Sequence, residues 1–179
     1  MDKKTIWDLG RDTLEEYRAR PKLPIAVVLD NVRSLNNIGS IFRTSDAFLV
    51  DRICLCGITA TPPSPEIHKT ALGAEDSVDW EYYPSTLEAL GRLRSLGYTI
   101  CVLEQVKGSV DLQRFRPDPR KRYAVVAGHE VQGVDPAVVD QADICLEIPQ
   151  YGTKHSLNVA VSTALAIWHL FVFSEAAEE

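Results

Sequence analysis

Residues 123–168 read YAVVAGHEVQGVDPAVVDQADICLEIPQYGTKHSLNVAVSTALAIW and alternate two apolar runs with two helical patterns. β-Strands that are connected through helices run parallel to one another, and the helices cover both faces of the sheet. The segment therefore predicts an α/β fold with a mostly parallel sheet. Its predicted strands are 123–130 and 144–149, and its predicted helices are 135–142 and the long apolar run from Ser156 to about Ser174.

The same alternation extends towards the N-terminus. Near-continuous apolar runs such as IAVVLDNV (25–32) are typical of strands that are buried on both faces. Nothing in the pattern separates two large domains, so we expect a short helical extension over 1–23 and one domain over 24–179. The pattern also predicts strands at 52–57, 80–83 and 99–105, helices at 37–49 and 85–97, a long proline-rich loop at 61–76, and an amphipathic helix over 5–20 with Ile6, Leu9, Leu14 and Tyr17 as its apolar points.

Composition places the chain among globular proteins. It has 179 residues, of which 45% are hydrophobic and 25% are charged, and these fractions exclude disordered and disulfide-scaffold classes. No window approaches the ~18 consecutive apolar residues of a membrane span, and the first residues do not resemble a secretory signal. We expect a cytoplasmic protein without membrane association, whose cysteines are reduced and buried in strands: Cys54, Cys56, Cys101 and Cys145.

The net charge of −6 argues mildly against a general polyanion binder. Three of the acids, Glu175, Glu178 and Glu179, lie in the last five residues and are expected to form a solvated tail, so a local basic surface is still compatible with the sequence. The spacing of His, Cys, Asp and Glu matches no metal site, and we expect no metal.

The first of three polar loops, LDNVRSLNNIGSIFRTSDA, covers residues 29–47. Its simplest interpretation is a helix start capped by Asn36 or Asn37, followed by a surface arginine. However, Arg43 lies among apolar residues of the predicted helix, and an arginine partly inside an apolar face usually has an anionic partner or ligand.

The second loop, VVAGHEVQGVDP, covers residues 125–136. A tight turn that leads to a helix, with Asp135 as its N-cap and Pro136 in its first position, explains the end of this loop but not Glu130. Gly128 would let a ligand approach the backbone closely. The spacing G-x-E-x-x-G places a negative charge where a dinucleotide fold holds a pyrophosphate, which favours a cationic or uncharged ligand.

The third loop covers residues 148–158, before the last predicted helix. Pro149 and Gly152 predict a turn, and Ser156 is a candidate N-cap for that helix. A capped core helix explains everything in this loop except Asn158. His129 and His155 are the histidines nearest to the three loops, while His68 and His169 are interpreted as loop and helix-surface residues; no nucleophile–base arrangement is visible.

Taken together, the loops resemble the three motifs of the SpoU (TrmH) family of RNA ribose methyltransferases. The matching segments are Asn37–Arg43, Gly128–Gly133 and Ser156–Ser162, and residues 68–80 are similar to the family's middle segment. The resemblance covers roughly residues 24–173. It implies that 24–179 is a catalytic domain with the SPOUT fold, in which helices cover both faces of the sheet and the carboxyl end forms a deep trefoil knot. It also implies a homodimer with the active site at or near the subunit interface.

The resemblance implies transfer of a methyl group from S-adenosylmethionine to the ribose 2′-hydroxyl of a tRNA or rRNA, with S-adenosylhomocysteine as product. The implied catalytic, substrate-side residues are Arg43, Asn37, Glu130, Ser156 and Asn158. The implied cofactor-binding residues are Leu103, Glu104, Gly128, Ile148 and Leu157. Candidate RNA contacts beside the motifs are Arg33, His68, Lys69, Lys154 and His155.

Several alternatives stay open at this point. The family mechanism makes Arg43 the base, whereas a guanidinium, being very hard to deprotonate, is equally suited to fixing a phosphate and stabilising the alkoxide. Asn37, Ser156 and Asn158 would orient the ribose.

The chain departs from many relatives because it is acidic and has only the short helix in place of an N-terminal RNA-binding domain. A non-catalytic protein of the same fold that binds S-adenosylmethionine or RNA is the main alternative. An ordinary nucleotide-binding enzyme would need a phosphate-binding glycine loop, which the sequence lacks.

The last predicted helix carries apolar residues on nearly every side: Leu157, Val159, Val161, Leu165, Ile167, Trp168, Leu170, Phe171 and Phe173. A helix that rests on a sheet needs only one apolar stripe, so the surplus predicts a partner subunit. The alternative is that the N-terminal helix of the same chain covers this surplus.

Overall fold

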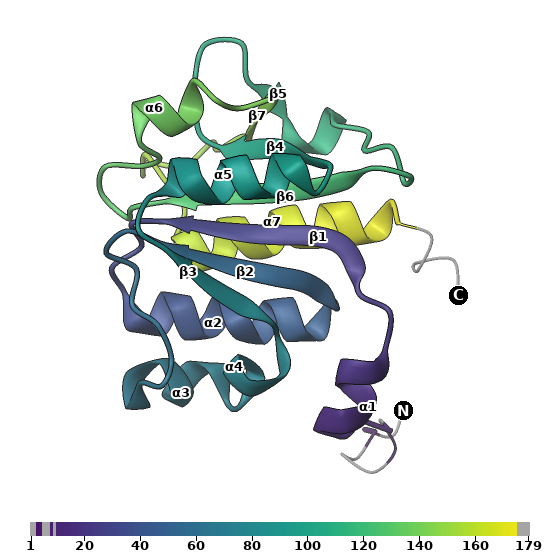
Figure 1. Ribbon diagram of the computed structural model, residues 1–179. Helices are drawn as coiled ribbons and strands as arrows, with labels where there is room; N and C mark the ends of the chain where they lie inside the picture. The colour runs from purple at the N-terminus through teal and green to yellow at the C-terminus, as the bar shows by residue number, and fades with distance from the viewer. Residues whose placement is uncertain (1–2, 5–7, 9, 175–179) are drawn as a thin grey trace.

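The computed structural model describes residues 3–4, 8 and 10–174, and its centre is one seven-stranded sheet (Figure 1). All pairs of neighbouring strands are parallel, in the order β3-β2-β1-β6-β4-β7-β5. The α/β fold and the parallel sheet are therefore confirmed. The strands are β1 (Leu23–Asp30), β2 (Val50–Cys56), β3 (Trp80–Tyr83), β4 (Tyr98–Leu103), β5 (Val110–Asp111), β6 (Arg122–Gly128) and β7 (Ile144–Glu147).

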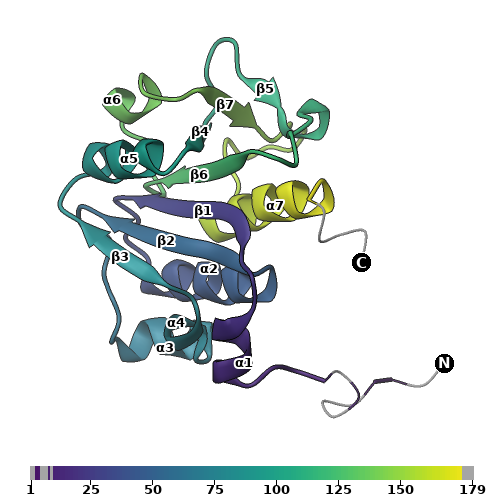
Figure 2. The ribbon, with the colours of Figure 1, turned by 45° about the vertical axis from the view of Figure 1, so that its right-hand side comes forward.

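Helices cover both faces of the sheet, as Figures 1 and 2 show. Residues of α2, α3 and α7 pack in one hydrophobic cluster, and residues of α5 and α6 pack in a second cluster on the opposite face. The helices are α1 (Leu14–Ala19), α2 (Leu35–Ala47), α3 (Pro65–Ala71), α4 (Ala74–Ser77), α5 (Thr86–Ser95), α6 (Pro136–Val139) and α7 (Val159–Val172), with a short 3₁₀ turn at Leu112–Arg114. Among the described residues, no helix has the length and apolarity that crossing a bilayer requires.

Strand β1 illustrates why the apolar runs become central strands. Ile25, Val27 and Leu29 belong to the cluster under α2 and α7, whereas Ala26 and Val28 belong to the cluster under α5. Because neighbouring side chains of a strand point to opposite faces, a strand with helices on both sides must be apolar at every position.

The proline-rich segment 61–76 is not a loop, and this prediction was wrong. It contains α3 and most of α4, and His68 therefore lies on a helix. Ser64 accepts the amide of Ile67 and Pro65 follows in the first helical turn, so the proline begins a helix instead of interrupting one. Gly39 permits the close packing of α3 on α2, because a Cβ there would lie 2.3 Å from the carbonyl oxygen of Ile67.

The helix predicted over 5–20 was too long: residues 10–13 are not helical, and the described helix spans Leu14–Ala19. The predicted apolar points Ile6 and Leu9 lie outside the described residues. The start is fixed by a capping box in which Thr13 and Glu16 bond reciprocally. This helix packs against α4, and Arg18 donates to the carbonyl oxygen of Asp76 at 2.6 Å. The glutamates of the predicted acidic tail, at 175–179, also lie outside the described part of the chain.

Three of the four cysteines are buried and the fourth, Cys145, is partly buried; all four are free thiols. Burial raises the pKa of the Cys54 and Cys101 thiols to about 12, so both are protonated at neutral pH. Within the residues that the structure describes, His, Cys, Asp and Glu form no cluster of three or more that could hold a metal ion.

Candidate active site

A cavity of about 510 Å³ opens at the carboxyl edge of the sheet, where β4, β6 and β7 end beside the start of α7. We call it the carboxyl-edge cavity. Ligands of open parallel sheets bind at this edge, and the volume lies within the usual range for small-molecule sites. The structure brings most of the predicted site residues together around this cavity: Leu103, Glu104, Gly128, Glu130, Ile148, His155, Ser156, Leu157 and Asn158.

The loop between β6 and α6 forms one wall of the cavity and folds back on itself. The backbone amides of His129 and Gly133 each donate to the other residue's carbonyl oxygen, at 3.0 and 2.8 Å. A Cβ at Gly128 would lie 2.4 Å from backbone atoms of Gly133 and Val134. The close approach expected at Gly128 is therefore made by the chain's own loop. Gly133 itself has a φ of +72°, a conformation that favours glycine.

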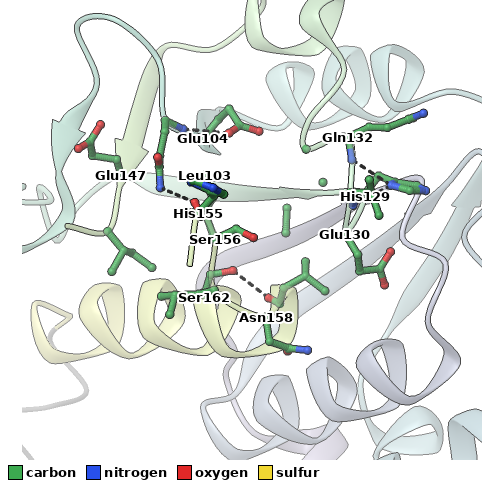
Figure 3. A pocket seen from close by; sticks show the side chains of 18 of the residues that line it. Leu103, Glu104, His129, Glu130, Gln132, Glu147, His155, Ser156, Asn158 and Ser162 are labelled. Carbon is green, nitrogen blue, oxygen red and sulfur yellow. Dashed lines mark hydrogen bonds between the residues drawn. The ribbon is translucent and has the colours of Figure 1, made fainter. Parts of the chain in front are cut away.

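Glu104 connects the end of β4 to this loop. Its carboxylate accepts the backbone amide of Val134 at 2.9 Å and that of Gln105 at 3.0 Å. Gln105 in turn donates to the carbonyl oxygen of His155 at 3.4 Å, which ties the third loop to β4. Figure 3 shows His155 and Ser156 on one side of the cavity, with His129, Glu130 and Gln132 on the other.

The cavity is lined by carboxylates and by no arginine or lysine of the described residues. Glu104, Glu130 and Glu147 all contribute to its wall. A pyrophosphate would meet like charge here without a compensating cation, whereas a ligand with a positive charge would be stabilised. The structure thus supports the preference for a cationic or uncharged ligand.

A chain of hydrogen bonds joins the three motif loops beside the cavity. Glu130 accepts the backbone amides of Arg33 and Ser34 at 3.1 and 2.9 Å, and also the side-chain amide of Asn37 at 3.1 Å. The amide oxygen of Asn37 accepts Nδ2 of Asn158 at 3.1 Å. Glu130 therefore holds the first loop in place, which is the role that a simple turn did not explain.

Of the three helix caps predicted in these loops, Asp135 is confirmed: it caps α6 by accepting the amide of Ala137, and Pro136 follows in the first turn. The other two predictions were wrong by a few residues. Ser34, and neither Asn36 nor Asn37, caps α2 by accepting the amide of Asn37. Asn158, and not Ser156, caps α7 by accepting the amides of Ala160 and Val161. Both asparagines are thereby committed to hydrogen bonds within the protein, while the exposed Ser156 side chain has no hydrogen bond to any described residue.

The environment of Glu130 favours its charged form. Burial raises its pKa, but hydrogen bonds from Arg33, Ser34 and Asn37 outweigh burial, so the pKa lies below the ordinary glutamate value. Such a group stabilises the folded protein above its unfolded pKa of about 4.3. This contribution is lost as the pH falls through the lowered pKa.

We therefore expect Glu130→Gln to lower the free energy of unfolding by about 1 kcal/mol at pH 7, a modest value because the carboxylate is partly exposed. Urea titrations at several pH values measure this difference, which should shrink as the pH falls below the unfolded pKa and vanish below the lowered pKa of Glu130 in the folded protein. Asp140→Asn, at an exposed carboxylate without a hydrogen bond to a described residue, is the matched control and should change little. A Glu130→Gln difference that does not depend on pH would contradict the role of the charge.

Arg43 does not line the carboxyl-edge cavity. With Lys69 it lines a separate hollow of about 540 Å³ between α2, α3 and α7, which we call the Arg43 hollow. The Arg43 side chain is exposed and has no ion pair or hydrogen bond with any described residue, so its expected placement in an apolar face was wrong. A third hollow, a groove of about 670 Å³ between α2 and α7, has Asn158 in common with the carboxyl-edge cavity and Thr44 in common with the Arg43 hollow.

Of the other candidate RNA contacts, His155 lines the carboxyl-edge cavity and Lys69 lines the Arg43 hollow. Arg33 and Lys154 are exposed on the first and third loops, and Lys69 follows on α3. The Nδ1 atom of His68 forms a hydrogen bond with the carboxylate of Glu75 at 2.6 Å. The other ring nitrogen, Nε2, is therefore the one that an RNA group could contact.

Asp30 is a site residue that the sequence analysis missed. It is 1% exposed, and its carboxylate accepts the hydroxyl of Thr86 at 2.6 Å and the backbone amide of Asp135 at 2.8 Å. It therefore fixes the end of the loop that forms the cavity wall. The signal was a carboxylate as the last residue of an otherwise apolar strand, because such a buried charge needs donors from its surroundings.

Comparisons with known proteins agree with this geometry. The sequence profile of the SpoU rRNA methylase family matches residues 24–168. The crystal structure of a TrmH/SpoU tRNA-modifying enzyme from A. aeolicus superposes with a TM-score of 0.80 at 27% identity, over 92% of this chain and 82% of that chain. A structure of an rRNA methyltransferase from Sinorhizobium meliloti with bound AdoMet has a TM-score of 0.76 at 26% identity, over 88% of this chain and 58% of that chain.

Curated relatives are similar at the same level. A Staphylococcus aureus (strain MSSA476) protein assigned to the TrmH family of tRNA/rRNA methyltransferases is 26% identical over 158 residues, which cover 88% of this chain. This chain spans 62% of that relative's length. Because the family profile matches most of the chain and the sheet superposes on solved members, the protein belongs to the SpoU rRNA methylase family.

Proposed function

We propose that the protein transfers a methyl group from S-adenosylmethionine to a ribose 2′-hydroxyl of a tRNA or rRNA. The observation that carries this proposal is the hydrogen-bonded chain Glu130–Asn37–Asn158, which assembles the three motif loops at one cavity. The names of relatives support the reaction class: a Mus musculus tRNA (guanosine(18)-2′-O)-methyltransferase, TARBP1, is 32% identical over 80% of this chain, although this chain covers only 9% of that protein.

The cavity fits S-adenosylmethionine by size and by charge. When bound, this molecule supplies a methyl group on a positively charged sulfonium. Carboxylates without an opposing arginine or lysine suit that charge, and the backbone of the loops offers hydrogen-bonding groups to an adenosine. We propose Leu103, Glu104, Gly128, Ile148 and Leu157 as the residues that hold it.

The chain's own residues would position the RNA. The Asn37–Asn158 pair fixes the first turn of α2 against the start of α7. Because both asparagine side chains already form hydrogen bonds within the protein, we propose that they hold the two helices in place and do not contact the substrate. The exposed hydroxyl of Ser156 is then the group that is available to contact the ribose.

Arg43 is assigned to the RNA phosphate and to the alkoxide that develops as the ribose hydroxyl attacks. A guanidinium is very hard to deprotonate, and Arg43 is exposed beside Lys69 without a partner among the described residues. An exposed, unpaired guanidinium beside a lysine is typical of an anion-binding site. Arg33, His68, Lys69, Lys154 and His155 remain the proposed further contacts to RNA.

Within one subunit, Arg43 and the cavity belong to different hollows, and this separation supports an active site between two copies of the chain. The face of α7 that turns away from the sheet carries exposed apolar side chains: Val161, Leu165, Trp168 and Val172. The described N-terminal helix packs on α4, which leaves this face uncovered. We therefore propose a homodimer that buries part of α7.

The proposal includes three further expectations. The segment after β7 passes against the ends of β4 and β6, through the bond from Gln105 to His155, which fits a deep trefoil knot at the carboxyl end. Residues 24–179 would form the catalytic domain and 1–23 an extension. The reduced, buried thiols are in accord with a cytoplasmic protein.

The first test is ligand binding. Isothermal calorimetry should show that S-adenosylmethionine binds with and without EDTA, and that S-adenosylhomocysteine competes for the same site. Methyl transfer to bulk tRNA or rRNA, followed with a labelled methyl group, separates an enzyme from a non-catalytic binding protein of the same fold. Methyl transfer that a chelator abolishes, or binding of NAD in place of S-adenosylmethionine, would contradict the proposal.

The second test is the oligomeric state. The wild-type protein should sediment as a dimer at micromolar concentration, and deletion of residues 1–20 should leave it dimeric. Trp168→Glu should raise the dimer dissociation constant at least ~30-fold, because a buried tryptophan is a typical interface anchor. Ile58→Glu, at an exposed apolar residue away from α7, is the control. A monomeric wild-type protein would contradict both the dimer and the shared active site.

A further inference from the structure

His129 is the residue around which the loop 129–133 folds. Its ring nitrogen Nδ1 accepts the backbone amides of Val131 at 3.1 Å and of Gln132 at 3.2 Å, and Figure 3 shows Gln132 beside the His129 ring. The carbonyl oxygen of His129 accepts the amide of Gly133 at 2.8 Å. Three consecutive amides of the loop, at 131–133, therefore have this one residue as their partner.

The two bonds to the ring fix its protonation state. A ring nitrogen that accepts a hydrogen bond carries no proton, so the ring of His129 is neutral and its single N–H is at Nε2. A doubly protonated imidazole has a donor on each nitrogen and offers no acceptor. A proton on Nδ1 would set donor against donor at both amides, and both hydrogen bonds would be lost.

The loop that His129 organises is a wall of the carboxyl-edge cavity. All five residues of 129–133 line the cavity, and Val131 and Gln132 in its middle are exposed. An exposed loop buries little apolar surface, so its shape depends on its hydrogen bonds.

The residues after the loop are held by other elements. The amide of Val134 is bonded to Glu104, and the amide of Asp135 is bonded to Asp30. The position of the loop's middle, in contrast, depends on Nδ1 of His129.

We propose that His129 is a positioning residue for S-adenosylmethionine: its neutral ring holds the loop 129–133 in the shape that binds the cofactor, and a proton on the ring releases the loop. The inference rests on the proposed function and adds a pH dependence to its cofactor site. The sign follows from the geometry. Because the binding shape requires an unprotonated Nδ1, the affinity for the cofactor is highest at alkaline pH and falls as the solution is acidified.

Other charged or titratable groups belong to the loop or to the elements packed around it. These are Glu130 and Asp135 beside the loop, Asp30 at the end of β1, Arg33 on the first motif loop, Glu104 after β4, Glu147 at the end of β7 and His155 on the third motif loop. Histidine is the residue type whose ordinary titration falls between pH 5 and 8. The histidines of this set are His129 and His155, and variants of His129 tell the two apart.

Asparagine separates the acceptor at this position from its titration. Its Oδ1 follows Cγ as Nδ1 does in histidine, and asparagine side chains commonly accept the amide two residues ahead, but they do not titrate. Calorimetry with S-adenosylmethionine at about pH 8 and about pH 5 compares the variants. His129→Asn should bind the cofactor nearly as tightly as the wild type at the higher pH and keep this affinity at the lower pH.

His129→Ala and His129→Phe have no acceptor at this place. Both should bind S-adenosylmethionine about 10-fold or more weakly at about pH 8. On acidification, the wild type should lose as much affinity as His129→Ala has already lost at the higher pH, because the same two amides lose their acceptor. Ionisation of the ligand itself is common to all variants and cancels in the comparison.

His169→Asn is the matched control. This histidine lies near the C-terminal end of α7, where its Nε2 is 2.9 Å from the carbonyl oxygen of Phe115, and it does not line the cavity. Its replacement should leave the pH profile of cofactor binding as in the wild type. Thermal unfolding of each variant, at both pH values, shows that a lost affinity is not a lost fold.

Three results would overturn the role of His129: a His129→Asn pH profile equal to that of the wild type, a His129→Asn affinity as weak as that of His129→Ala, or a His129→Ala affinity equal to that of the wild type at about pH 8. Each leaves the proposed function standing, provided that the wild type binds S-adenosylmethionine and methylates RNA. A wild-type protein that binds no S-adenosylmethionine at either pH would contradict the proposed function itself.

Discussion

Arg43→Ala should reduce methyl transfer to RNA by at least ~10³-fold while the affinity for S-adenosylmethionine stays within about twofold of the wild type. Arg43 is exposed, lies in a hollow separate from the carboxyl-edge cavity and has no partner among the described residues. Its removal therefore takes no contact from the cofactor and no packing from the core. Removing one group that stabilises a developing oxyanion costs ~10²–10³ in rate, and the lost phosphate contact adds to this.

Single-turnover methyl transfer with saturating RNA, together with calorimetry, measures these two effects separately. Arg43→Lys should recover only a small part of the activity, because an ammonium cannot make the paired hydrogen bonds of a guanidinium. Arg92→Ala, at an exposed arginine on α5 on the opposite face of the sheet, is the matched control. Near-normal turnover of either Arg43 variant would remove this residue from the mechanism.

Gly128→Ala should abolish cofactor binding, with an expected loss of more than ~100-fold. The added methyl group would lie 2.4 Å from backbone atoms of Gly133 and Val134, and backbone cannot rotate away as a side chain can. The loop 129–133 must then move, which breaks the amide contact of Val134 with Glu104. A displaced cavity wall loses the geometry on which binding by backbone groups depends.

Gly91→Ala is the control for this variant, since a Cβ at Gly91 has no neighbouring atom within 4 Å. Gly91 lies inside α5, where alanine should stabilise the protein by about 0.5–1 kcal/mol. The thermal unfolding midpoint should thus be higher than that of the wild type for Gly91→Ala and lower for Gly128→Ala. A folded Gly128→Ala protein with full affinity for S-adenosylmethionine would show that the close approach does not set the cavity wall.

The sequence was sufficient to predict the parallel sheet and the place of the site, because both depend on local patterns. Continuous apolar runs define the strands, and the polar residues after β6 and β7 must meet at one edge once those strands run parallel. The two-residue strand β5 was missed, since a strand of that length has no periodicity to detect.

The connections within the site could not be predicted in the same way. Asn37 bonds to Glu130 and to Asn158, which are 93 and 121 positions away. Hydrogen bonds between residues so far apart depend on how whole helices and strands pack against one another. In the sequence, each asparagine taken alone resembles an ordinary helix cap. The exposure of Arg43 was misjudged for a related reason: its apolar neighbours Phe42 and Ile41 point into the core, and the helix turns the guanidinium to the outside.

The order of the strands has a consequence for how the protein folds during its synthesis on the ribosome. The central strand β1 pairs with β2, which follows it closely, and with β6, so that Val27 lies opposite Val125. At a synthesis rate of ~5–20 residues per second, the ~100 residues between those partners take about 5–20 s to emerge. During this interval one edge of this strand, which is apolar up to Asp30, has no partner, and unpaired apolar edges are where nascent chains adhere to one another. A chaperone that binds extended apolar segments should therefore contact LPIAVVLD, residues 23–30, in nascent chains that are stalled before residue 122, and release it once β6 has been made.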